Sequence, residues 1–81
     1  MKDLEIFERV NALSEEEERL YRLAGDGQGL GTEESERLRV INVELDRCYD
    51  LLHQRTARRA TGQNPDEAAA RPAGVVERYQ Q

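Results

Sequence analysis

The sequence predicts an all-α fold, an antiparallel two-helix hairpin of coiled-coil type with a short C-terminal tail that docks on it. Two runs of apolar residues recur at helical spacing, and a glycine-rich stretch separates them. The chain has 81 residues, which is enough for one domain with a small core. Residues 1–60 therefore form the predicted hairpin, and residues 61–81 form the tail.

The first helix is predicted over residues 3–24, because its apolar residues recur three, four and seven positions apart. Ser14 to Glu17 also matches a capping box, which would start a new helix at Ser14. The apolar phase continues across Ser14 and favours one continuous helix, with Glu17 as a polar layer. The residues of this phase are Ile6, Val10, Leu13, Leu20 and Ala24.

Residues 25–31 contain four glycines and predict a turn. A phosphate-binding loop would need a strand before the glycines, whereas a helix precedes them here. A calcium loop starting at Asp26 would place Gly31 correctly, but Leu30 replaces an oxygen ligand and Arg37 replaces the final glutamate. We therefore expect a plain hairpin turn and no bound metal or cofactor.

The second helix is predicted over residues 33–60, with Thr32 as its N-cap and Gly62 as its stop. Its apolar seam alternates three and four residues apart, as in a coiled coil. Val40, Val43 and Leu51 lie outside this seam, so one neighbouring helix cannot cover them all. Two copies of the hairpin are expected to pair into a four-helix bundle, a homodimer. The seam residues are Leu38, Ile41, Leu45, Cys48 and Leu52.

Charged residues predict mostly solvated faces. Asp46 and Asp50 lie four residues apart and are expected to form an exposed like-charge pair rather than a catalytic one. Four glutamates precede an arginine by four residues, the favoured order for helical ion pairs. These pairs are Glu5/Arg9, Glu15/Arg19, Glu18/Arg22 and Glu33/Arg37.

The single cysteine, Cys48, excludes an intrachain disulfide, and its place on the seam favours a core residue over a redox group. His53 points away from Cys48 on the helix, so the two cannot share a metal. No nucleophile, base and oxyanion donor can be assembled, so no enzyme activity is expected. Acidic residues near the N-terminus and the lack of a long apolar stretch predict a soluble cytoplasmic protein without a membrane segment.

The net charge of -5 is unevenly distributed. The first 54 residues carry seven basic and 14 acidic side chains, whereas residues 55–81 carry five basic and three acidic ones. An acidic body argues against general nucleic-acid binding. The only basic cluster is Arg55, Arg58 and Arg59, which either complements the helix C-terminus opposite the acids of the first helix or contacts an anion, RNA or an acidic partner.

The tail begins with Asn64 and Pro65, an N-cap followed by proline at the first helical position. A short helical turn is predicted through Ala68 to Ala70, ending before Arg71 and Pro72. Beyond it lie Val75, Val76 and Tyr79, which a disordered tail would not need. We expect residues 72–79 to lie against the flank of the second helix that carries Val40 and Leu51.

The C-terminal half closely resembles an uncharacterised family of short actinobacterial proteins, a domain of unknown function, and the first helix resembles it in pattern. The resemblance rests on Glu44 to Leu52, then Arg55, Arg58-Arg59, Asn64-Pro65-Asp66, Arg71-Pro72 and Val75 to Tyr79. The long glycine-rich turn and Arg78 depart from the family pattern. The resemblance supports the boundaries above and implies no activity.

The sequence predicts a structural or regulatory protein-interaction module that acts through helix packing, as a homodimer or with an unidentified protein. The rival hypothesis is a nucleic-acid- or ribosome-associated factor that uses the three arginines. The predicted interface consists of Val40, Ile41, Leu45, Cys48, Leu51, Leu52, Val75, Val76 and Tyr79.

Overall fold

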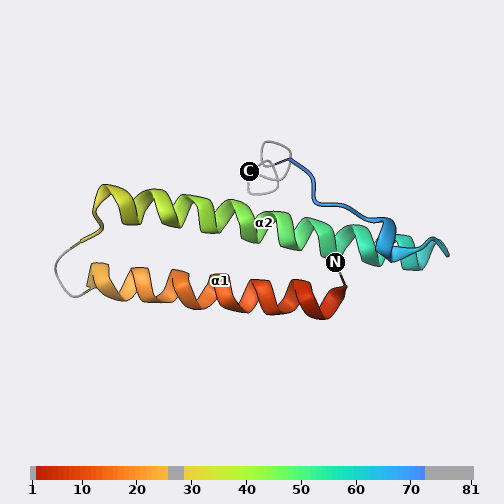
Figure 1. The fold of residues 1–81 in the computed structure, drawn as a ribbon, viewed down its shortest axis with the longest axis horizontal. Helices are drawn as coiled ribbons and strands as arrows, with labels where there is room; N and C mark the ends of the chain where they lie inside the picture. The colour runs from red at the N-terminus through yellow and green to blue at the C-terminus, as the bar shows by residue number, and fades with distance from the viewer. Residues whose placement is uncertain (1, 26–28, 73–81) are drawn as a thin grey trace.

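The computed structural model describes residues 2–25 and 29–72 and contains two long antiparallel helices (Figure 1). Helix α1 spans Asp3–Leu23 and helix α2 spans Thr32–Ala60. A 3-10 turn, η2, follows at Pro65–Glu67. No strand occurs among the described residues. The prediction of an all-α helical hairpin is confirmed.

Helix α1 runs unbroken through Ser14, because its apolar stripe keeps its phase there. At its start, the backbone N–H of Lys2 donates to the Glu5 carboxylate at 3.0 Å. That contact satisfies a donor that would otherwise lack a partner at the helix end. The capping box at Ser14 therefore starts no second helix.

Helix α2 begins one residue earlier than expected. Gly31 occupies the N-cap position, and Thr32 is the first helical residue rather than the cap. At the other end, Gly62 adopts a φ of 77°, which L side chains rarely tolerate. The N–H of Gly62 donates to the Arg59 carbonyl and the N–H of Gln63 to the Arg58 carbonyl, at 3.2 and 2.7 Å. This Schellman motif ends the helix where the glycine predicted a stop.

The core lies between the helices and under the start of the tail. Ile6 and Ile41 are fully buried, one on each helix. Val10, Leu20 and Leu52 are partly buried against the cluster. Its remaining buried members are Leu13, Leu45, Cys48, Leu51 and Ala68.

The tail turns back at Gly62 and runs along α2 toward its middle (Figure 1). The helical turn covers Pro65–Glu67 and stops at Ala68, whose φ of -67° and ψ of 142° are extended. The expected turn through Ala70 was therefore placed too late. Because the backbone is extended after Ala68, its carbonyls are not used in helical hydrogen bonds and can accept hydrogen bonds from side chains of α2. Val75, Val76 and Tyr79 lie outside the described residues.

Neither α1 nor α2 combines the length and the apolar character that a bilayer-spanning helix requires, as judged on residues 2–25 and 29–72.

Candidate interaction surfaces

Of the six described residues of the predicted packing face, four lie inside the hairpin itself. Ile41, Leu45 and Cys48 are buried against α1, and Leu51 is buried beside the tail residue Ala68. Val40 and Leu52 are half-buried. A second protein therefore cannot reach the four buried residues without opening the hairpin.

The predicted arginine cluster is divided by the fold. Arg55 is only 4% exposed and joins three elements. It contacts Asp3 of α1, and its Nη1 donates to the Asp66 carboxylate and the Pro65 carbonyl, both at 3.0 Å. Arg55 is therefore a structural junction. Of the three arginines, only Arg58 and Arg59 remain near the surface, half-buried and exposed.

Asp3 holds the start of α1 against the end of α2. The Arg59 Nη2 donates to its carboxylate at 2.6 Å, and Arg55 contacts the other oxygen. Hydrogen bonds from Arg59 and then Arg55 lower the Asp3 pKa below its usual value of 3.8. The arginines thus face an acid of the first helix, as one of the two sequence interpretations required.

Asp50 is a site that sequence reasoning missed. It was expected to be exposed, yet it is only 1% exposed and accepts two hydrogen bonds from Arg71. The Arg71 Nε lies 2.9 Å from one carboxylate oxygen and its Nη2 lies 2.6 Å from the other. Gln54 adds a third bond at 2.9 Å. The tail covers this carboxylate and supplies the cation that makes its burial tolerable.

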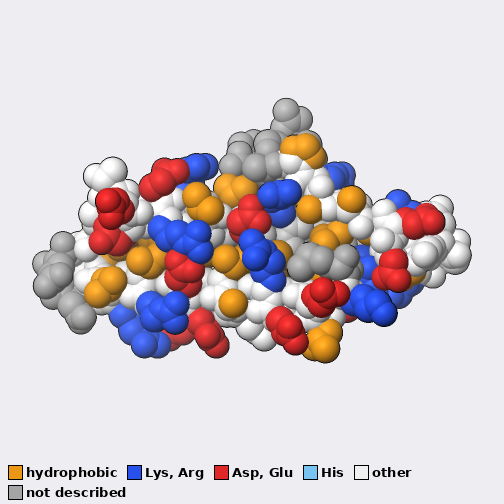
Figure 2. Space-filling model, in the orientation of Figure 1, with side chains coloured by type: hydrophobic (Ala, Val, Ile, Leu, Met, Phe, Trp, Pro, Cys, Tyr) orange, Lys and Arg blue, Asp and Glu red, His pale blue; other side chains and the backbone are white. Residues whose placement is uncertain are grey.

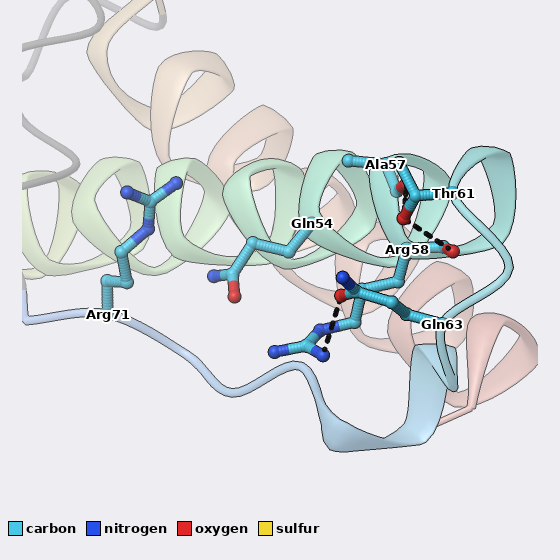
Figure 3. A pocket seen from close by; sticks show the side chains of 6 residues that line it. All are labelled: Gln54, Ala57, Arg58, Thr61, Gln63 and Arg71. Carbon is cyan, nitrogen blue, oxygen red and sulfur yellow. Dashed lines mark hydrogen bonds between the residues drawn. The ribbon is translucent and has the colours of Figure 1, made fainter.

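A shallow groove of about 410 Å³ opens between the end of α2 and the tail (Figure 3). The Arg58 Nη1 donates to the Gln63 side chain at 3.3 Å across it. The Thr61 hydroxyl turns back to the Ala57 and Arg58 carbonyls, both at 3.2 Å. The groove lies between two parts of one chain and is lined by Gln54, Ala57, Arg58, Thr61, Gln63 and Arg71.

The edge of the hairpin nearest the tail is closed by ion pairs between the helices. Arg9 reaches Glu44 at 3.3 Å, and Arg37 makes two bonds to Glu16. The bonds from Arg37 lower the Glu16 pKa. Two of the four arginines predicted to pair within a helix thus bridge the helices instead, because they lie beside the core stripe. The predicted pair of Glu18 and Arg22 does form, at 2.7 Å.

The opposite face of the hairpin carries large apolar side chains that the other described residues leave about half exposed. Phe7 and Tyr21 on α1 are 52% and 54% exposed, and Tyr49 on α2 is 47% exposed. At about 100° per residue, all three lie on the side of the core stripe away from Arg9 and Glu44. We call these three residues, with half-buried Val10 and Leu52, the open face.

The face of the molecule in view in Figure 2 carries no patch of a single charge. Figure 2 shows acidic and basic side chains interleaved over the face in view, with apolar side chains between them. Among residues 2–25 and 29–72, no three histidine, cysteine, aspartate or glutamate side chains are grouped as metal ligands would be. Positions 26–28 of the turn lie outside the described residues.

Cys48 is a buried free thiol, and burial raises its pKa. Arg9 acts in the opposite direction but more weakly. A thiol with a raised pKa is a poor nucleophile. His53 is exposed on α2.

A family model described as "Protein of unknown function (DUF2630)" matches residues 2–81. Similar proteins include uncharacterized proteins of Mycobacterium tuberculosis and Mycobacterium bovis. Each is 44% identical over 77 residues, which cover 95% of this chain and 88% of the relative. No solved structure matches the chain.

Proposed function

Because the chain belongs to the DUF2630 family, whose description assigns no function, we propose from the geometry that it is a small protein-interaction module that acts by helix packing. Its partner on the open face is a second copy of itself. The module acts as a homodimer and catalyses no reaction. The observation that carries the proposal is the set of large apolar side chains left exposed on one face.

The open face has the arrangement that helix pairing requires. Phe7 and Tyr21 are two heptads apart on α1 and therefore lie near the same line along the helix. Arg9 pairs with Glu44, so Phe7 lies at the level of α2 residues just beyond Glu44, where Tyr49 is found. The aromatic pair at one end of the face and Tyr21 at the other provide anchors, since aromatic residues dominate interface energetics.

Polar residues on this face favour a defined register. Glu17 and Ser14 lie between Val10 and Tyr21 and are half-buried already. A polar layer within an apolar seam costs stability but selects one alignment of the helices. A two-fold axis would place the same open face of each copy against the other, as a symmetric dimer does.

The size of the hairpin is compatible with a stable dimer. The chain measures 51 × 24 × 16 Å, so its broad face is large enough. A standard interface buries roughly 800 Å² per partner. That area is a modest share of the 5704 Å² exposed by the single chain.

A nucleic-acid- or ribosome-associated role receives less support. It depended on Arg55, Arg58 and Arg59 acting together, and Arg55 is buried in contacts with Asp3 and Asp66. Phosphate contacts need a continuous basic surface. Arg59 also forms an ion pair with Asp3, which partly neutralises its charge.

The same proposal includes a cytoplasmic location. The free, buried thiol of Cys48 supports it, because free cysteines are typical of reducing compartments. The sequence likewise predicts a cytoplasmic protein.

Sedimentation equilibrium of three variants tests the proposed face. Phe7→Ser and Tyr49→Ser are expected to weaken self-association at least tenfold, because each removes a large apolar anchor. Leu23→Ser is the matched control, since Leu23 is 49% exposed but lies about 160° around α1 from Phe7. Equal weakening by all three variants, or none by the first two, would refute this face as the interface.

A further inference from the structure

The flank of α2 that faces the tail binds main-chain carbonyls, one in the 3-10 turn and two in the extended stretch after Ala68. Three side chains of this helix donate hydrogen bonds to main-chain carbonyls of the tail. Residue numbers rise along the tail as they fall along α2, so the segment runs antiparallel to the helix (Figure 1). The bonds are Arg55 to Pro65 at 3.0 Å, Gln54 to Ala69 at 2.8 Å and Arg47 to Arg71 at 3.1 Å.

Three further contacts select side chains. The Asp66 carboxylate accepts a hydrogen bond from Arg55 at 3.0 Å. Asp50 is buried and accepts a two-bond fork from Arg71, a geometry that a lysine ammonium cannot reproduce. Ala68, three residues earlier, is 8% exposed and packs in the cluster that contains Leu51. The contacts therefore require a segment that is extended from a small residue onward and has an arginine three positions later.

Between positions 61 and 72, polar contacts are the main link between the tail and α2. Ala68 is its only buried residue between positions 61 and 72, whereas Ala69, Ala70 and Pro72 are exposed. Burying one alanine contributes little compared with a large aliphatic side chain. Another segment with the same backbone path, the small residue, the arginine and an acid in the place of Asp66 would make the same contacts with the flank.

We propose that the tail-facing flank of α2 is a peptide-recognition groove, which the chain's own residues 64–72 fill as an intramolecular ligand. The groove consists of Arg47, Asp50, Leu51, Gln54 and Arg55. The partner is an extended protein segment that carries a small residue and, three positions later, an arginine. The tail both covers Asp50 and supplies its cation, so a segment that replaces the tail must bring an arginine of its own, because covering the carboxylate without a cation is costly. This site is separate from the open face and does not depend on dimer formation.

Tethering explains how the tail keeps the groove filled. A ligand attached by a short linker acts at an effective concentration in the millimolar range. A free segment at micromolar concentration cannot compete with it unless the tail is weakened. The test therefore starts from a full-length chain whose own arginine is removed.

The experiment measures binding of a labelled synthetic peptide of residues 63–72 to full-length Arg71→Ala by fluorescence anisotropy. We expect saturable binding, at least tenfold weaker for the same peptide with lysine in place of its arginine and at least tenfold weaker to the wild-type chain. Adding Asp50→Asn to the Arg71→Ala chain should abolish the preference for arginine over lysine. Equal binding of both peptides, or no binding, would overturn the proposal.

Circular dichroism first establishes that Arg71→Ala is helical. If it is not, the wild-type chain is titrated with millimolar peptide and followed by amide NMR. The arginine peptide should then shift the Asp50 and Gln54 resonances and the lysine peptide should not. The absence of arginine-dependent shifts there would equally overturn the proposal.

Discussion

Removing Arg71 should destabilise the folded chain far more than its exposed position on the tail implies. Arg71→Ala leaves Asp50, which is 1% exposed, with Gln54 as its remaining hydrogen-bond donor among the bonds described above. Breaking a buried ion pair from one side costs roughly 3–5 kcal/mol. The Arg71 side chain is 43% exposed, so water already screens the pair, and the lower end, about 3 kcal/mol, applies.

A double replacement separates the cost of an orphaned charge from the net contribution of the pair. Asp50→Leu together with Arg71→Met removes both charges and keeps apolar volume on each side. This double variant should lose only about 0–1 kcal/mol, because well-packed apolar residues often replace a buried pair without penalty. The double variant should therefore be more stable than Arg71→Ala, which is the signature of a buried pair.

Urea unfolding followed by circular dichroism at 222 nm measures both quantities, at one fixed protein concentration because dimer formation contributes to stability. A loss of about 3 kcal/mol corresponds to a drop of roughly 12–24 °C in the thermal midpoint for a chain of this size. Arg71→Ala within about 0.5 kcal/mol of the wild type would refute the reasoning, since exposed pairs contribute only that much.

Three further outcomes are expected. The free energy of unfolding should fall as the pH drops from about 5 through the lowered pKa of Asp3, because Arg59 and Arg55 stabilise the charged carboxylate. In urea titrations at several pH values, Asp3→Asn should reduce this loss of stability at acidic pH. Ile41→Ala should cost about 2–5 kcal/mol by the same unfolding assay, since Ile41 is fully buried, whereas a smaller loss would place it outside the core. Cys48 should react with iodoacetamide at pH 8 at least tenfold more slowly in the native chain than in urea, and equal rates would contradict its burial and raised pKa.

The sequence was sufficient for two helices joined as a hairpin because the signals there are local. Apolar periodicity and a cluster of glycines depend only on neighbouring residues. The Gly62 stop is similarly local, since a positive φ at the end of a helix favours glycine over other residues. The errors at Thr32 and Ala68 are shifts of element ends by one to three residues.

The burial of Asp50 was beyond such reasoning. Two aspartates four residues apart on a helix are typical of a solvated face, and the partner of Asp50, Arg71, lies 21 residues away in a segment without periodicity. Arg55 carried a usable signal, because it continues the three-four alternation of Cys48 and Leu52. A charged residue at a seam position is as consistent with a buried ion pair as with the end of the apolar seam.

The measurement that tests the account most directly is the molar mass of the wild-type chain by light scattering at micromolar concentration. The proposal predicts twice the monomer mass of 9.3 kDa, with the helicity of the hairpin retained. Each large side chain of the open face left in water would forgo about 1.5–3 kcal/mol of burial, which favours the dimer. A monomer mass at this concentration, with full helicity by circular dichroism, would contradict the central claim.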